Sequence, residues 1–465
     1  MASTLKFSVR RQEPVLVAPA KPTPHEFKLL SDIDDQQSLR FQIPVIQFYP
    51  YNPSMDRRDP CRVIRDSLAR VLVYYYPFAG RLRESPDRKL VVECTGEGVL
   101  YIEADADVKL QELSQRLQPP FPYLDELLYD IPGSGGILHC PLLLIQVTRL
   151  SCGAFILALR LNHTMADASG FVQFLKAAGE IARGAETPSL LPVWERHLLS
   201  ASTALHVRFS HREYECFPAG STFVNLVTSR NEMTHRSFFI GPADISNLRT
   251  HLPTSLRHAS TFDILTATFW RCRTAALHLV PDEEVRVLCI ANARRKFNPP
   301  LPDGYYGNVF AFPAAVSTAS ELCGHSLGYA VELVRKAKFS VTEEYIRSVA
   351  NLMALAGKPQ FQPAAITYLV SDVRLAGFQE LDFGWGGPVY GGPAAGDVGT
   401  VPGVSSFYIP FRNYEGVKGI LIPICLPRQA MEEFIVELEK ATRGVGERVV
   451  EDKDGLSFSF IKPAI

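Results

Sequence analysis

The stretch LALRLNHTMADASGFVQF, residues 157–174, places His163 four residues before Asp167. A neutral imidazole, with an ordinary pKa of ~6.5, can take a proton from a hydroxyl group near neutral pH and return it later in the reaction. Small residues around the pair leave room for a substrate: Ala166, Ala168, Ser169 and Gly170. The residue types are compatible with His163 as a general base, while Asp167 could orient it, cap the following helix or pair with an arginine. An ordinary polar turn with an aspartate N-cap is the alternative that the pattern alone leaves open.

Metal chemistry has weaker support in the same residues. A His/Asp pair at this spacing could supply two ligands, but a protein metal site needs three or four. The nearest other histidines, His139 and His197, stand at no recognised ligand spacing, and the chain contains no H-E-x-x-H. The sequence therefore predicts no metal site.

A second motif resembles the nucleophile elbow of serine hydrolases. GHSLG, residues 324–328, matches G-x-S-x-G, which requires a strand before the serine and a histidine later in the chain. The residues before Ser326 are typical of a helix, and no histidine follows His325. We therefore expect no hydrolase triad at Ser326.

Length and charge bound the remaining possibilities. A chain of 465 residues exceeds one ordinary core and predicts two or three domains. Lys+Arg number 48 against 49 Asp+Glu, so no global positive field favours nucleic acid or an anionic membrane as a partner. No segment approaches the roughly 20 apolar residues of a bilayer-spanning helix.

The cysteine pattern indicates a reducing compartment. Nine cysteines are scattered without a C-x-x-C pair, as in Cys289 within VRVLCIA, which favours buried free thiols over a disulfide framework. The N-terminus shows no apolar signal region, and the final IKPAI is not a peroxisomal S-K-L signal. The sequence predicts a cytosolic protein.

The elements that must position His163 can be read from hydrophobic spacing. Apolar runs at 142–150 and 154–161 predict a buried hairpin that ends directly before His163, and helical spacing then runs to about Gly184. Further predicted helices cover 62–76, 260–277, 321–339, 343–356 and 429–443, and predicted strands cover 235–241 and 284–295. The irregular alternation favours an α+β fold, and G-x-G-x-x-G and Walker motifs are missing from the expected positions. We expect an N-terminal domain over 1–200, a long connection at 186–225 and a C-terminal domain over 226–465.

Five ordered motifs resemble the BAHD family, the plant acyl-CoA-dependent acyltransferases. His163 and Asp167 match its H-x-x-x-D hallmark, and DFGWG at 382–386 matches its second hallmark unaltered. Further matches are YYPFAGRL (75–82), STFDILTA (260–267) and PPLPDGYYGN (299–308). The resemblance covers nearly the whole chain.

This resemblance implies a fold and a reaction. The family has two similar-sized chloramphenicol-acetyltransferase-like domains with a two-layer α/β arrangement and a channel between them, and a segment near 370–400 can cross back to the first domain. Acyl-CoA is a co-substrate rather than a bound cofactor, and it meets the hydroxyl acceptor at the histidine. His163 is then the general base, and a monomer is expected.

The resemblance also implies supporting roles. Asp167 is expected to turn away from the channel and pair with Arg294 in ANARRKF. The DFGWG residues, Asp382, Gly384, Trp385 and Gly386, are expected to support the site from a distance. Ser260 and Thr261 fall where the family approaches the CoA arm.

One departure from the family concerns the oxyanion. Many members carry Thr-Ser-Trp eleven residues before DFGWG, where this chain has Ser371, Asp372 and Val373. With Val373 at the position of the tryptophan, this chain lacks the indole N–H as a donor. One oxyanion donor can contribute ~3 kcal/mol of transition-state stabilisation. Ser371 is the predicted remaining side-chain donor, beside backbone or water.

The N-terminal half resembles the branch that makes benzoate, acetate or anthraniloyl esters of small alcohols. The matching stretches are residues 17–49 and LPVWERHLL at 191–199. The favoured substrates are benzoyl-CoA and benzyl alcohol, with acetyl transfer to aliphatic alcohols or anthraniloyl transfer to methanol as alternatives. A catalytically silent acyl-CoA-binding protein on the same scaffold is the remaining alternative.

Overall fold

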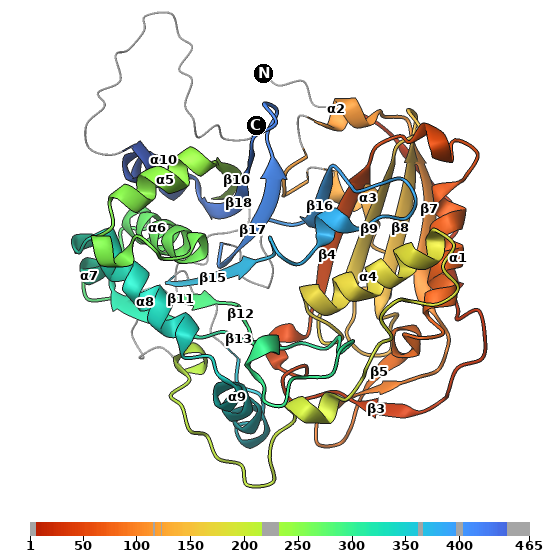
Figure 1. Cartoon of the computed structure of the whole chain (residues 1–465), viewed down its shortest axis with the longest axis horizontal. Helices are drawn as coiled ribbons and strands as arrows, with labels where there is room; N and C mark the ends of the chain where they lie inside the picture. Colours follow the sequence, from red (N-terminus) through yellow and green to blue (C-terminus); the bar gives the residue numbers. More distant parts are fainter. Residues whose placement is uncertain are drawn as a thin grey trace, which may run out of the picture.

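The computed structural model describes residues 6–114, 117–121, 123–215, 232–360, 366–396 and 403–443. Cys216 and the C-terminal IKPAI lie outside these residues. Figure 1 shows two sheets lying next to each other, each with helices packed on it. The mixture of helices with mixed parallel and antiparallel sheets confirms the predicted α+β class.

The first sheet carries the candidate base. Its strands run in the order β1-β7-β8-β9-β4-β16, with β2 also paired to β7. Their bounds are β1 (Val9–Arg11), β2 (Val15–Val17), β4 (Gln42–Tyr49), β7 (Val99–Ala106), β8 (Leu143–Leu150), β9 (Phe155–Asn162) and β16 (Tyr390–Pro393). Strands β8 and β9 form the expected antiparallel hairpin, with Leu143 opposite Leu161.

Two helices, α1 (Pro60–Val71) and α4 (Ala168–Ala182), pack together over this sheet (Figure 1). Their apolar faces join the strands in one large core. The last strand, β16, comes from the C-terminal half of the chain and pairs antiparallel with β4, with Tyr390 opposite Phe48. The two halves of the chain are therefore joined by backbone hydrogen bonds as well as by side-chain packing.

The second sheet has the order β10-β18-β17-β15-β11-β14. Its strands are β10 (Met233–Ile240), β11 (Glu284–Cys289), β14 (Ala314–Thr318), β15 (Thr367–Asp372), β17 (Ser405–Arg412) and β18 (Lys418–Pro427). The helices associated with its core are α5 (Pro242–Thr250), α6 (Thr261–Ala276), α7 (Ala319–Gly324), α8 (Leu327–Phe339) and α10 (Arg428–Arg443). Ser260 caps α6, since its Oγ accepts from the Asp263 N–H while the Asp263 carboxylate accepts from the Ser260 N–H.

Smaller elements complete the chain. They are β3 (Phe27–Leu29), β5 (Arg81–Glu84), β6 (Leu90–Glu93), α2 (Leu110–Ser114), α3 (Leu124–Leu127), β12 (Ala291–Asn292), β13 (Phe310–Ala311) and α9 (Glu343–Leu355). In the connection predicted at 186–225, the described residues form only short 3-10 turns at Arg196–Leu199 and Arg212–Tyr214. Among the described residues, no helix combines the length and the apolar character needed to cross a membrane.

Two predicted helices differ from the observed ones. The helix predicted over 62–76 ends at Val71, and a short 3-10 helix, Tyr76–Ala79, follows. The β-branched Val73 and the three consecutive tyrosines after it are poor helix formers, so the α-helix does not continue through them. The helix predicted over 321–339 was wrong as a single element, because Gly324 ends α7 and Ser326 stands at the N-cap of α8.

Candidate functional site

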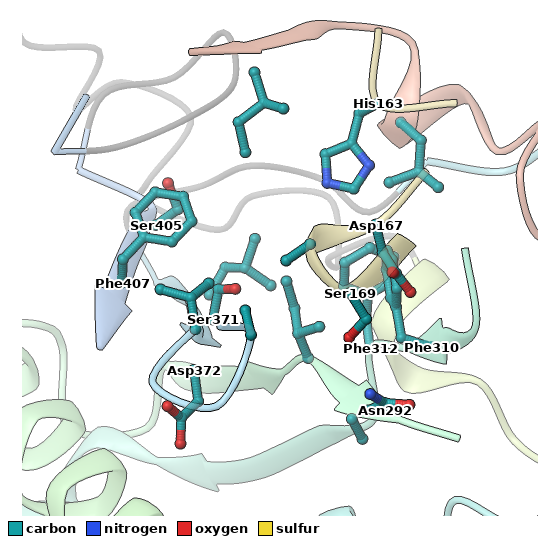
Figure 2. Close-up of a pocket in the computed structure, with 18 of the residues that line it drawn as sticks. His163, Asp167, Ser169, Asn292, Phe310, Phe312, Ser371, Asp372, Ser405 and Phe407 are labelled. Atoms are coloured by element: carbon teal, nitrogen blue, oxygen red, sulfur yellow. The ribbon is translucent and has the colours of Figure 1, made fainter. Parts of the chain in front are cut away.

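A cavity of about 720 Å³ is lined by residues that come from both sheets. His163 enters it from the end of β9, while Ser371 on β15 and Ser405 on β17 line it from the other sheet (Figure 2). The walls combine aliphatic side chains with eight phenylalanines: Phe41, Phe171, Phe262, Phe310, Phe312, Phe339, Phe378 and Phe407. A largely apolar cavity of this size with a few polar groups suits a small organic substrate.

The structure fixes the position of His163 through its backbone. β9 pairs with β4 up to Asn162 opposite Gln42, and the His163 N–H then donates to the carbonyl of Phe41 at 2.9 Å. The imidazole packs near the rings of Phe41 and Phe310, whose centroids are 5.2 and 6.1 Å away. A histidine at the end of a paired strand that also packs against two aromatic rings has a restricted orientation.

Burial lowers the pKa of His163 below its ordinary value, because the charged imidazolium is poorly solvated there. Its own backbone carbonyl, Asp167 and other neighbours oppose that effect without reversing it. The imidazole is therefore neutral at physiological pH, the form that can accept a proton. The side chain is only partly buried, so the cavity gives a hydroxyl group access to it.

Asp167 lies against Arg294 rather than against His163. Arg294 Nη1 donates to Asp167 Oδ2 at 2.5 Å and Nη2 donates to Oδ1 at 2.8 Å. The same carboxylate caps α4 by accepting from the Gly170 N–H at 3.0 Å and accepts from the Val309 N–H at 3.1 Å. Asp167 thus links the start of α4 to the segments that carry Arg294 and Val309. It is both the N-cap of α4 and the partner of Arg294.

Gly170 sets how closely two of these segments approach. A Cβ atom built on Gly170 would lie 2.0 Å from the carbonyl oxygen of Tyr306. Any larger residue would push the loop that carries Tyr306 and Asn308 away from α4. The glycine after the H-x-x-x-D motif therefore has a packing role.

The predicted oxyanion donor lies in the cavity. Ser371 is on β15, opposite Phe407 of β17 in a parallel pairing, and its side chain is partly exposed. Val373, two residues after Ser371, also lines the cavity and is 6% exposed. The other polar and charged residues that line the cavity are Gln37, Ser38, Arg40, Asp167, Ser169, Asn292, Lys296, Lys338, Gln360, Asp372, Ser405 and Ser406.

Ser260 and Thr261 lie at the start of α6, next to the cavity residue Phe262. The Ser260 hydroxyl also accepts from Lys338 Nζ at 3.3 Å, and the same ammonium donates to Asp263 at 2.5 Å. Lys338 itself lines the cavity. This corner therefore presents a cation and a helix N-terminus.

The DFGWG residues lie outside the cavity lining. The Asp382 Oδ1 accepts from the N–H groups of Gly384 and Gly386 at 2.7 and 2.8 Å and closes a tight turn. Gly384 has a φ of +113°, and Trp385 is buried edge-on against Phe155, with the centroids 5.2 Å apart. These contacts anchor the segment that leads into β16.

Two other histidine-containing patterns lie away from the cavity. Ser326 is exposed and follows helix α7, so the strand that a nucleophile elbow needs is not there. Glu213, His211 and Ser348 form a hydrogen-bonded series, with Ser348 Oγ 2.9 Å from His211 Nε2. All three are at most 5% exposed and none lines the cavity, so the series holds the connection against α9.

Two buried residues next to His163 were not predicted. Asn308 donates from Nδ2 to the His163 carbonyl at 2.9 Å, and Asp34 accepts from the same amide. Asn308 is the last residue of the matched motif PPLPDGYYGN. Its partners His163 and Asp34 lie 145 and 274 residues away in the sequence, and local residue spacing does not predict contacts over such separations. Among the described residues, no group of three or more His, Cys, Asp or Glu could hold a metal ion.

The Transferase family profile matches residues 7–441. The chain is 60% identical to a benzyl alcohol O-benzoyltransferase of Petunia hybrida over 465 residues, covering 100% of this chain and 99% of that protein. A benzyl alcohol O-benzoyltransferase of Nicotiana tabacum is 58% identical over the same lengths. An alcohol acyl transferase 1 (allele GSd) of Malus domestica is 53% identical over 94% of both chains.

Solved structures share the fold at low sequence identity. Vinorine synthase matches with a TM-score of 0.69 and 20% identity, covering 94% of this chain and 98% of that chain. TRI101 of F. graminearum, in complex with coenzyme A and deoxynivalenol, matches with a TM-score of 0.69 and 14% identity, covering 88% and 96%. These likenesses support the two-domain architecture expected from the motifs.

Proposed function

The chain belongs to the BAHD family of acyl-CoA-dependent acyltransferases, and we propose that it transfers benzoyl from benzoyl-CoA to the hydroxyl of benzyl alcohol. The products are benzyl benzoate and free CoA. The observation that carries this proposal is a partly exposed His163 at a cavity of about 720 Å³ whose apolar lining includes eight phenylalanines. Planar benzoyl and benzyl groups both suit such walls, because aromatic rings pack edge-on or offset against one another.

In the proposed reaction, His163 Nε2 accepts the alcohol proton while the alcohol oxygen attacks the thioester carbonyl. A new C–O bond forms, and the carbonyl electrons pass to the oxyanion. When the carbonyl reforms, the C–S bond breaks and the proton on His163 passes to the CoA sulfur. Base and acid are thus the same side chain, and the enzyme returns to its starting state.

Ser371 is the side chain we propose for the oxyanion. Its hydroxyl faces the cavity from the sheet opposite His163, and a donor in a water-poor site stabilises developing charge more than water would. With Val373 in place of a tryptophan, no indole N–H shares this task. For the CoA arm we propose the corner formed by Ser260, Thr261 and Lys338.

Asp167 and Arg294 act as structural supports in this proposal, and so do Asp382, Gly384, Trp385 and Gly386. We further propose that the protein is a cytosolic monomer with no nucleic acid or membrane partner. The balance of positive and negative residues supports the absence of a nucleic acid partner. Eight free cysteines among the described residues support a reducing compartment.

A second candidate is transfer of acetyl or anthraniloyl groups to aliphatic alcohols or methanol. The alcohol acyl transferase of Malus domestica at 53% identity favours keeping it. The test is a panel of benzoyl-, acetyl- and anthraniloyl-CoA against benzyl alcohol, an aliphatic alcohol and methanol, read out as free thiol and ester. Benzoyl-CoA with benzyl alcohol should give the highest kcat/KM, and absence of thiol release with every pair would indicate a silent acyl-CoA-binding protein.

A further inference from the structure

A fully buried carboxylate lies directly behind the turn that carries His163. Asp34 is 0% exposed and accepts from Arg196 Nη1 at 2.8 Å, which balances its charge. Its Oδ1 also accepts from the backbone N–H and from the side-chain Nδ2 of Asn308, both at 2.9 Å. Its Oδ2 accepts from the Ser31 hydroxyl at 2.6 Å. Asp34 is therefore held rigidly and in turn holds Asn308.

The contacts of Asn308 fix which way its amide faces. Its Nδ2 donates to the Asp34 carboxylate and to the His163 carbonyl, each at 2.9 Å. Both neighbours are acceptors, and an amide NH₂ has two hydrogens to donate. Rotating the amide by half a turn would place its oxygen against two other oxygens, so the hydrogen-bond network settles the orientation.

The orientation leaves one atom of Asn308 to pair with His163. Among the described residues, Asn308 Oδ1 and His163 Nδ1 are both buried atoms with no hydrogen-bond partner of good geometry. A buried polar atom left unpaired destabilises the folded state, so a hydrogen bond between these two atoms is favoured. Burial lowers the pKa of His163, and hydrogen bonding by the Asn308 side chain works in the opposite direction. Catalytic hydrogen bonds are commonly long or poorly aligned before substrate binds.

We propose that Asn308, held by Asp34, accepts the Nδ1 proton of His163 and so keeps Nε2 free to act as the base. This inference rests on the proposed role of His163. The other acceptor near Nδ1 is the His163 carbonyl, which Asn308 Nδ2 holds in place. Asn308 is a positioning residue: it selects the tautomer and orients the ring.

The chemistry explains why an amide suits this position. An aspartate at 308 would place a second carboxylate beside Asp34 and a negative charge beside the imidazole. The charged groups around the ring are Asp34 and Asp167, and each already pairs with an arginine, Arg196 and Arg294. A neutral acceptor therefore leaves the pKa of His163 low while still fixing its proton.

The first test measures the tautomer in the unaltered protein. Histidine labelled with the heavy nitrogen isotope is incorporated, and the His163 signals are assigned by their loss in His163→Gln. At neutral pH the proton is expected on Nδ1, with Nε2 unprotonated. A proton on Nε2 would overturn the proposal without any variant having to fold.

The second test compares two buried asparagines. Asn308→Leu removes the acceptor, and kcat is expected to fall about 100-fold or more with little change in KM, because general base catalysis contributes at least that much. Asn351→Leu is the matched control, since Asn351 is 5% exposed, bridges Ser202 and His206 and touches no cavity residue by hydrogen bond. It should lose stability but keep its kcat per folded molecule.

The outcomes separate this inference from the proposed function. If His163→Gln abolishes turnover while Asn308→Leu keeps the full kcat, His163 remains the base and the role of Asn308 is wrong. If His163→Gln turns over normally, the proposed function itself fails.

Discussion

Arg294 holds Asp167 through two parallel hydrogen bonds of 2.5 and 2.8 Å, across 127 residues of sequence. Both carboxylate oxygens of the aspartate in the H-x-x-x-D motif therefore accept hydrogen bonds from Arg294, and neither pairs with the histidine four residues before it. The side chains of the pair are 10% and 21% exposed, so water screens the interaction only in part. This arrangement separates the two motif residues into one candidate for chemistry and one for support.

Asp167→Asn is expected to lower the free energy of unfolding by about 3 kcal/mol, because the charge of Arg294 loses its partner in a largely buried place. The measurement is chemical denaturation at neutral pH. Glu437→Gln is the control: it removes an exposed ion pair with Lys440, 2.7 Å apart, and should change stability by about 0.5 kcal/mol or less. Equal stability of Asp167→Asn and the unaltered protein would contradict the supporting role.

The activity should depend on pH through His163. Because burial lowers the pKa of this imidazole, kcat/KM should rise as the pH rises through a midpoint below ~6.5 and then level off. Because of the same lowered pKa, the folded state binds the His163 proton less readily than the unfolded state does. The free energy of unfolding should therefore decrease as the pH falls from ~6.5 toward that midpoint. A midpoint above the ordinary histidine value would show that another group controls the reaction.

Ser371→Ala should lower kcat about 100-fold while KM changes little, because an oxyanion donor acts mainly in the transition state. Steady-state kinetics with benzoyl-CoA and benzyl alcohol provide the measurement. Ser169→Ala is a useful comparison, since Ser169 lines the same cavity from the start of α4. An equal loss in both variants would argue against a specific oxyanion role for Ser371.

Gly384→Ala should destabilise the fold by about 1–3 kcal/mol, because φ is +113° and the new Cβ would lie 2.7 Å from Met55 Cε. Thermal melting measures the loss, and kcat per folded molecule should be retained. Gly324→Ala is the matched control, since its Cβ would meet nothing within 4 Å. A normal melting temperature with a large loss of kcat would give the DFGWG segment a direct part in the chemistry instead.

The elements around His163 could be predicted because their signals are local. The β8–β9 hairpin, the helix after it and the Ser260 cap of α6 each follow from residues within one short stretch. The helix predicted to reach residue 76 was too long because apolar spacing continues through Tyr75, although the tyrosines favour other backbone conformations. Periodicity records which side chains are buried and not where a helix ends.

The surroundings of the histidine could not be predicted in the same way. Asp34 and Asn308 are 274 residues apart, and only the packed fold brings them together behind His163. The cavity walls likewise combine Phe41, Phe310 and Phe407 from three distant segments. Motif resemblance located the candidate base, whereas the structure was needed to find what holds it.

The most direct test of His163 as the general base is release of free CoA thiol by His163→Ala, with benzoyl-CoA and benzyl alcohol as substrates. Turnover should fall about 10²- to 10⁴-fold relative to the unaltered protein. His325→Ala, which changes an exposed histidine outside the cavity lining, should leave turnover unchanged. Turnover by folded His163→Ala within a few-fold of the unaltered protein would contradict the assignment.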